Sequence, residues 1–200
     1  MKKGSKKPSK QEVNLWVKKW KENLPVYVLQ EKILSNLFRN YPKNTEESEV
    51  KIKVKTLNLY YSTNVLATDQ MAEHIYKLQI DEKLKKGDLD LVEKIANLNL
   101  KNGEKRVFYS FASKYCNFHN SDKYPIYDSI VSDLLYQFNK SHKFYRNGNF
   151  TKKELKESEN YSQYKEIIDA FRNFFKLKEF GYKDIDRYLW TMGKISKQSK

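Results

Sequence analysis

Apolar side chains recur every three or four positions along most of this chain, which is the spacing of one face of an α-helix. The first such stretch starts near Gln11 and ends at Pro25, and a second runs from about residue 26 to residue 39. Similar stretches follow over about 69–78, 88–98, 105–118, 128–139, 161–175 and from 183 or 184 onward. The pattern predicts an all-α protein, a single globular domain of roughly nine or ten helices.

One stretch, over residues 50–63, fits two patterns. Val50, Ile52 and Val54 alternate with lysines, which is typical of an exposed strand. The apolar run then continues through Leu57 without a turn signal, and two glutamates precede it as in the first turn of a helix. We favour a helix here.

Three segments fall outside the helical pattern. Residues 1–10 form a Lys-rich tail that we expect to be disordered, and residues 194–200 form a second basic tail. Between them lies a helical domain, residues 11–193, with a polar loop or insertion at 142–160 around Gly148. No apolar run reaches the roughly 18 residues that a membrane-spanning helix needs, and no apolar stretch of a signal peptide follows the basic start. With the single cysteine, Cys116, these features favour the cytoplasm and no membrane partner.

The charge of the chain changes this picture by pointing to a partner. The formal net charge is +14 over 200 residues. Residues 1–10 hold five lysines and residues 194–200 hold three, with no acid in either segment, so the tails carry eight of the 14 charges. A balance of this kind is typical of proteins that bind nucleic acid, and DNA is the partner we expect.

Most of the common catalytic motifs are missing from the sequence. It contains no GxxxxGK[ST] or GxGxxG, no HExxH or paired CxxC, and no GxSxG. We therefore expect no cofactor and no metal. Cys116 and His119 are one helical turn apart, but a buried structural thiol is the favoured interpretation.

The segment SFASKYCNFHNSDKYPIYDSIV, residues 110–131, holds the best candidate for chemistry. Pro125 cannot lie inside a helix, so Asp128 is predicted at a helix start, where free N–H groups favour a carboxylate. Capping alone explains such an aspartate, and a functional carboxylate is the alternative. Lys105 and Lys114 could supply an amine or a phosphate contact. The aromatic residues nearby could stack on bases or form core, namely Tyr109, Tyr115, Tyr124 and Tyr127.

Two resemblances add to this interpretation. The segments NLYYSTNV at 58–65, SFASKYCNFHN…YPIYDS at 110–129 and YKDIDRYLWTMGK at 182–194 resemble signatures of an uncharacterised family of small bacterial proteins. More remotely, the order of a turn at 101–104, a helix and then Pro125-Ile126-Tyr127-Asp128 resembles the helix-hairpin-helix DNA glycosylase superfamily. Only Gly103 remains of the glycines that form the hairpin of that superfamily.

The second resemblance implies an all-helical glycosylase-like fold and an enzyme that cleaves the N-glycosidic bond of DNA. Asp128 would stabilise the positive charge that develops on the sugar, and Lys105 would be the nucleophile of a bifunctional enzyme. Tyr109, Tyr115 or Tyr127 would line the base pocket, with Tyr124 and Lys114 as further substrate contacts. The alternatives are a non-catalytic module that binds nucleic acid or protein, and a structural protein whose charge serves solubility.

Overall fold

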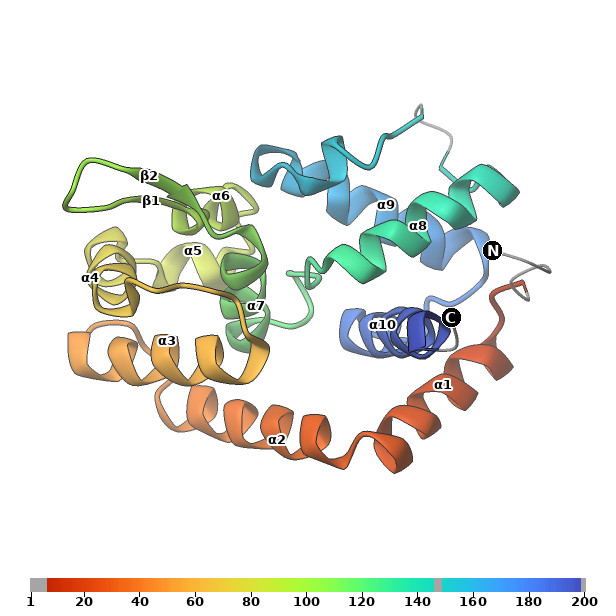
Figure 1. Cartoon of the computed structure of the whole chain (residues 1–200), viewed down its shortest axis with the longest axis horizontal. Coiled ribbons are helices and arrows are strands. Elements are labelled where there is room, and N and C mark those ends of the chain that lie inside the picture. Colours follow the sequence, from red (N-terminus) through yellow and green to blue (C-terminus); the bar gives the residue numbers. More distant parts are fainter. Residues whose placement is uncertain (1–6, 146–148, 199–200) are drawn as a thin grey trace.

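The helices surround one continuous hydrophobic core. The computed structural model describes residues 7–145 and 149–198. In this part of the chain ten α-helices and a two-stranded sheet are formed. Helices α3 to α7 gather on one side and α8 to α10 with α1 on the other, and α2 extends along the base of both groups (Figure 1). The described part of the chain is predominantly helical. Buried apolar residues of both groups belong to the same core cluster, so the protein is a single domain.

Local sequence signals explain how the first helices begin and end. Helix α1 spans Lys10–Asn23, and the Ser9 hydroxyl accepts a hydrogen bond from the backbone N–H of Glu12. Pro25 ends this run and is the first residue of α2, Pro25–Asn40, where its missing N–H costs nothing. The ambiguous stretch is helix α3, Glu47–Tyr61. The predicted helix is confirmed.

The first helical group contains a feature that the sequence analysis missed. After α4 (Thr68–Leu78), α5 (Asp81–Lys86) and α6 (Asp90–Ala96), strand β1 (Asn97–Asn99) pairs antiparallel with β2 (Lys105–Val107). The turn at 101–104 is present, with Gly103 at φ +85°. The expected helix start at 105 is wrong, because residues 105–107 form β2 and α7 spans Tyr109–His119. Each strand has only three residues, too few to show a clear period of two.

The second group contains α8 (Ser129–His142), two short 3₁₀ helices (Glu154–Lys156 and Ser158–Asn160), α9 (Tyr161–Phe174) and α10 (Tyr182–Gln198). The segment expected as a polar loop at 142–160 contributes buried side chains to the core, namely Phe144, Tyr145, Phe150 and Leu155. A separate tail from residue 194 was also expected. Helix α10 instead continues through Gln198. The expected disordered N-terminal tail falls mainly on residues 1–6, which lie outside the described residues.

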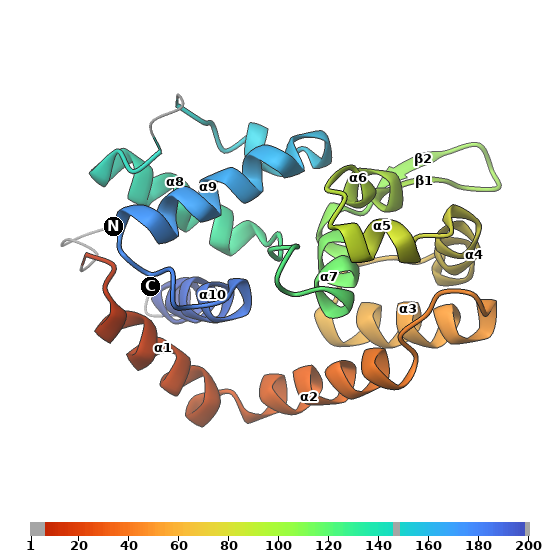
Figure 2. The ribbon, with the colours of Figure 1, turned by 180° about the vertical axis from the view of Figure 1, so that it is seen from behind.

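Seen from behind, α10 lies beside α1 and packs against α8 (Figure 2). Gly193 on α10 faces Ile130 on α8, and a Cβ atom at Gly193 would lie 2.3 Å from a methyl carbon of that side chain. The small residue thus permits close packing of α10 on α8. None of the described helices is both long and apolar enough to cross a membrane.

Candidate active site

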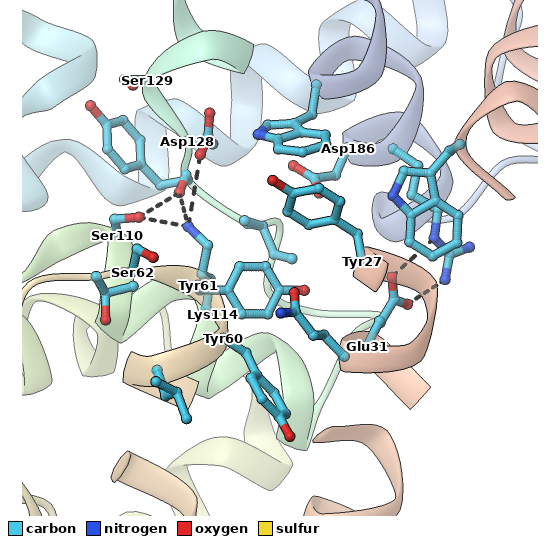
Figure 3. A pocket seen from close by; sticks show the side chains of 18 of the residues that line it. Tyr27, Glu31, Tyr60, Tyr61, Ser62, Ser110, Lys114, Asp128, Ser129 and Asp186 are labelled. Atoms are coloured by element: carbon cyan, nitrogen blue, oxygen red, sulfur yellow. Dashed lines mark hydrogen bonds and ion pairs between the residues drawn. The ribbon is translucent and has the colours of Figure 1, made fainter. Parts of the chain in front are cut away.

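A cavity of about 810 Å³ lies where α2, α3, α7, the segment before α8 and α10 meet (Figure 3). Its lining combines aromatic rings with charged groups, among them Tyr27, Tyr61, Lys114, Asp128 and Asp186. The volume lies within the usual range for sites that take a small molecule or a nucleobase. The site depends on the tertiary fold, because its lining residues come from five separate parts of the chain.

Asp128 lies at the start of α8, as the sequence predicts. Its backbone is extended, and its Oδ1 accepts a hydrogen bond of 2.8 Å from the backbone N–H of Ile130. The other oxygen, Oδ2, lies 4.0 Å from Nζ of Lys114, and 22% of the side chain is exposed. The capping bond and the helix dipole therefore hold a carboxylate at the cavity wall.

Lys114 is the buried amine of the cavity. It comes from the middle of α7, and its Nζ donates to Oγ of Ser110 at 2.6 Å and to the carbonyl oxygen of Tyr127 at 3.2 Å. The same nitrogen lies 5.5 Å from the centre of the Tyr61 ring. Burial lowers the pKa of Lys114, while the carboxylates of Asp128 and Asp186 act in the opposite direction. The amine is thus easier to deprotonate than an exposed lysine.

Asp186 is a second carboxylate of the cavity wall, presented by α10. Its buried Oδ1 has no hydrogen-bond partner among the described residues. Burial, followed by the nearby charge of Asp128, raises the pKa of Asp186 to about 7, although Lys114 and Arg187 act against the rise. A carboxyl group with this pKa can donate or accept a hydrogen bond near neutral pH.

An ion-pair cluster closes one side of the cavity. Arg187 on α10 donates from Nε and Nη2 to the two carboxylate oxygens of Glu31 on α2, and Lys183 lies 3.7 Å from the same carboxylate. The guanidinium also lies 4.8 Å from the centre of the Trp20 ring. These contacts tie α10 to α1 and α2 and fix the position of Asp186.

Aromatic rings form the rest of the wall. Tyr27 and Trp190 meet edge to face with ring centres 5.1 Å apart, and Lys194 lies over both rings. Tyr127 lines the cavity, and Tyr109 is stacked on it at 4.0 Å without being a lining residue itself. Tyr109 therefore supports the wall.

Two other tyrosines that the sequence singled out lie in the core. The hydroxyl of Tyr115 donates to Oδ1 of Asn44 at 2.6 Å, and that of Tyr124 donates to the carbonyl oxygen of Asp88 at 3.0 Å. Both side chains are fully buried and neither lines the cavity. The structure thus places them in the core, which was the alternative to base stacking.

Lys105, the expected nucleophile, does not lie at the site. It belongs to β2, is exposed, and is not among the residues that line the cavity. The structure places Lys114 beside Asp128 instead. The sequence analysis chose Lys105 because it lies near the position of the hairpin in the glycosylase superfamily. In this chain that position is occupied by the antiparallel strands β1 and β2, and Lys105 is exposed on β2.

The cysteine–histidine pair gives no second site. Cys116 is fully buried, and burial raises the pKa of its thiol well above the usual range. Nε2 of His119 lies 3.3 Å from Nδ2 of Asn44, and the ring packs edge-on against Phe38 and at a tilt against Tyr115. The favoured interpretation, a buried structural thiol, is confirmed.

Sequence reasoning missed several lining residues, among them Glu31, Tyr61, Asp186 and Trp190. Asp186 and Trp190 are four residues apart in YKDIDRYLWTMGK, so one helical turn places them on one face of α10. This spacing was a signal that could have been used. For the other two, the local sequence offers no comparable signal.

The comparisons with known proteins can now be placed on this geometry. Residues 12–123 match the family model HI_0787_N, an N-terminal domain, and this match covers more than half of the chain. The chain belongs to this family. The match includes Glu31, Tyr61 and Lys114, whereas Asp128 and Asp186 lie beyond its end.

A relative from Haemophilus influenzae (strain ATCC 51907 / DSM 11121 / KW20 / Rd), named "Uncharacterized protein", is 41% identical over 138 residues. This alignment covers 68% of the chain and 62% of the relative. No solved structure matches the chain. The expected membership of an uncharacterised bacterial family is confirmed.

Proposed function

We propose that this protein is a DNA glycosylase-like enzyme that cleaves the N-glycosidic bond of an extruded nucleotide in the cavity at Lys114. The observation that carries the proposal is the buried amine of Lys114 beside the capped carboxylate of Asp128 in an aromatic-lined cavity. The positive net charge of the chain supports a polyanionic substrate.

Asp128 provides the electrostatic part of this chemistry. As the bond between C1′ and the base breaks, positive charge develops on the sugar, and a fixed carboxylate stabilises it. The capping hydrogen bond to Ile130 restrains the Asp128 side chain before substrate arrives. Little reorganisation is then needed in the transition state.

Lys114 provides the nucleophile. Its nitrogen lone pair forms a bond to C1′, and the electron pair of the breaking C1′–N bond leaves with the base. The attached nitrogen loses a proton to Asp128, whose Oδ2 is 4.0 Å from Nζ, and the departing base takes this proton from Asp128. The lowered pKa of Lys114 favours the neutral amine that this step requires.

The aromatic rings and Asp186 bind the base in this scheme. The rings of Tyr27, Tyr127 and Trp190 offer stacking or edge contacts to a planar base. The carboxyl group of Asp186, which lines the cavity, offers a hydrogen-bond partner to its edge. This assignment replaces the exposed Lys105 by Lys114 and keeps Asp128 in its expected role.

The test uses a panel of duplex oligonucleotides, each carrying one modified base, with released base detected by mass spectrometry. We expect the wild type to release a base from at least one duplex, and Asp128→Asn to release none while still binding DNA. Asn also caps helices, so this variant keeps the start of α8. Base release that survives in Asp128→Asn would overturn the role of the carboxylate.

The role of Lys114 has a separate readout. Borohydride should trap a covalent complex between the wild type and a cleaved duplex, and Lys114→Gln should give none. Lys105→Gln, which alters the exposed lysine of β2, is the matched control and should be trapped like the wild type. DNA binding without release of any base would favour the alternative, a non-catalytic nucleic-acid-binding module.

A further inference from the structure

We propose that α2 and α10 form a gate at one wall of the cavity, and that the cavity opens when these two helices part. The inference goes beyond the proposed function, because it holds whatever reaction the cavity performs. It rests on the long side chains that join the two helices, which start from Tyr27 and Glu31 on α2.

The gate consists of an aromatic contact and an ionic contact. Tyr27 meets Trp190 edge to face at 5.1 Å, and its hydroxyl accepts a hydrogen bond from Lys194. One helical turn further along α2, the Glu31 carboxylate accepts hydrogen bonds from Nε and Nη2 of Arg187. Tyr27 and Glu31 are labelled in Figure 3, at the side of the cavity opposite Ser110. Because Tyr27, Glu31, Arg187 and Trp190 all line the cavity, the gate is part of its wall.

The two helices of the gate pack on different parts of the molecule. Helix α10 packs closely on α1 and α8, whereas α2 packs on α3 and α7. A separate contact between the two helical groups is the packing of α6 on α9 and on the second 3₁₀ helix. In both views of the ribbon this contact lies above α7 and α10, and α2 lies below them (Figures 1 and 2). The contact at α6 can therefore remain closed while α2 and α10 part.

The junction between α1 and α2 is a suitable hinge for this motion. Pro25 has no backbone N–H, and Leu24 has φ −129° and ψ 52°, outside the helical region. From this junction the two helices diverge in both views (Figures 1 and 2). Because the helical backbone is interrupted here, the angle between α1 and α2 can change without breaking a turn of either helix. Helix α1 can then move with α10, and α2 with α3.

The ionic contact makes closure of the gate depend on one carboxylate. Glu31 is the counter-charge of two cations, because Lys183 lies 3.7 Å from it in addition to Arg187. The three side chains are only 13–22% exposed, so salt screens their attraction less than it screens surface pairs. Without the charge of Glu31, two like charges of α10 would face α2. Arg187 would keep its pair with Asp184 on α10, which makes no contact across the gate.

The test measures how readily a small reagent reaches Lys114 inside the cavity. Formaldehyde with cyanoborohydride methylates amines, and mass spectrometry of peptides gives the rate at each lysine. The Lys114 side chain is almost fully buried, so its rate reports on opening of the cavity. Lys53 is the internal reference. It is also buried, its amine donates to the carbonyl oxygens of Tyr41 and Lys43, and it does not line the cavity.

Glu31→Gln should raise the rate at Lys114, relative to that at Lys53, by about tenfold, because it removes hydrogen bonds between charged groups that hold the gate closed. Gln has nearly the same size as Glu, so the variant opens no hole in the wall. Lys183→Gln weakens the same cluster at a residue that does not line the cavity, and should give a smaller rise. It decides the question if Glu31→Gln does not fold.

Glu73→Gln is the matched control. Glu73 pairs with Lys77 and Lys101 on the first helical group, and it does not line the cavity. This substitution also removes one carboxylate that bridges two lysines, but it should leave the ratio of the two rates unchanged.

The outcomes are independent of the proposed reaction, because the measurement uses no nucleic acid. A ratio in folded Glu31→Gln equal to that of the wild type overturns the gate. An equal acceleration at Lys53 and Lys114 also overturns it, since the variant would then loosen the whole core. Loss of glycosylase chemistry with a raised ratio would refute the proposed function and leave the gate in place.

Discussion

At the residue scale, Asp128 shows how one side chain can stabilise a helix and be placed for chemistry. One of its oxygens caps α8, and the other lies within 4.0 Å of the Lys114 amine. Capping needs only a hydrogen-bond acceptor at the helix start, whereas the proposed catalysis needs a negative charge. The two roles can therefore be separated by substitution.

Asp128→Ala should lower the free energy of unfolding by about 1 kcal/mol, because the capping hydrogen bond of α8 is lost. Asp128→Asn should change it much less, because Asn is a comparable cap. Urea denaturation followed by circular dichroism measures both variants. Equal stability of the two would show that the side chain contributes no cap.

The ionisation of Asp186 should make the stability of the protein depend on pH. Its pKa is about 7 in the folded protein and 3.8 in an unperturbed carboxyl group, so the folded state binds the proton more tightly. The stabilising contribution of the protonated group is therefore complete below about pH 4 and is lost as the pH rises to about 7. Ionised Asp186 destabilises the fold above that range.

Asp186→Asn removes this ionisation. We expect the variant to resemble the wild type near pH 4 and to be more stable at pH 8, by about 1–3 kcal/mol. Thermal unfolding across this pH range measures the difference. Asp122→Asn, at an exposed carboxylate between α7 and α8, is a suitable control for a general change of charge. A stability difference that is independent of pH would contradict the assigned pKa.

At the element scale, the position of α10 decides whether the cavity exists. This helix presents Asp186 and Trp190 to the cavity, and Gly193 allows it to pack closely on α8. The Arg187–Glu31 ion pair fixes it to α2 from the other side. A change that displaces α10 should disturb both stability and substrate binding.

Gly193→Ala tests this packing. The added methyl group would overlap Ile130 and lie 3.1 Å from Leu134, which costs about 1–3 kcal/mol. The gain from replacing glycine in a helix is about 1 kcal/mol at most, so we expect a net loss of stability. Gly181→Ala is the control, because the nearest atom that its methyl group would meet is 4.0 Å away. Equal urea midpoints for the two variants would contradict the close contact.

At the scale of the whole molecule, charge and fold make separate contributions. Five lysines and no acid lie in residues 1–10, so this segment carries five of the 14 net positive charges. Charge of this kind attracts phosphate without regard to base sequence and weakens as salt rises. The cavity, by contrast, is formed by the folded part of the chain.

Deleting residues 2–7 tests this division. The deletion removes four lysines but keeps Ser9, which caps α1. We expect weaker DNA binding, with the salt dependence reduced by about 0.9 for each lost phosphate contact. Base release at saturating DNA should remain. Complete loss of binding would show that the tail, and not the folded part, carries the affinity for DNA.

The sequence predicted most of the helices and the part of the cavity wall that lies within residues 110–131. Helix boundaries followed from apolar spacing and from Pro25, both of which act on neighbours along the chain. The position of Asp128 at a helix start followed from Pro125, which cannot lie inside a helix, and from the preference of aspartate for the capping position. The strands β1 and β2 were missed because they have three residues each.

The choice of lysine and the composition of the cavity were decided only by the tertiary structure. Lys105 and Lys114 are alike in the sequence, but packing of α7 against the segment before α8 buries Lys114 beside Asp128 and leaves Lys105 exposed. Glu31, Tyr61 and Asp186 reach the same cavity from helices distant in the sequence. Local spacing fixes which face of a helix a residue occupies, whereas the meeting of those faces depends on long-range packing of the whole core.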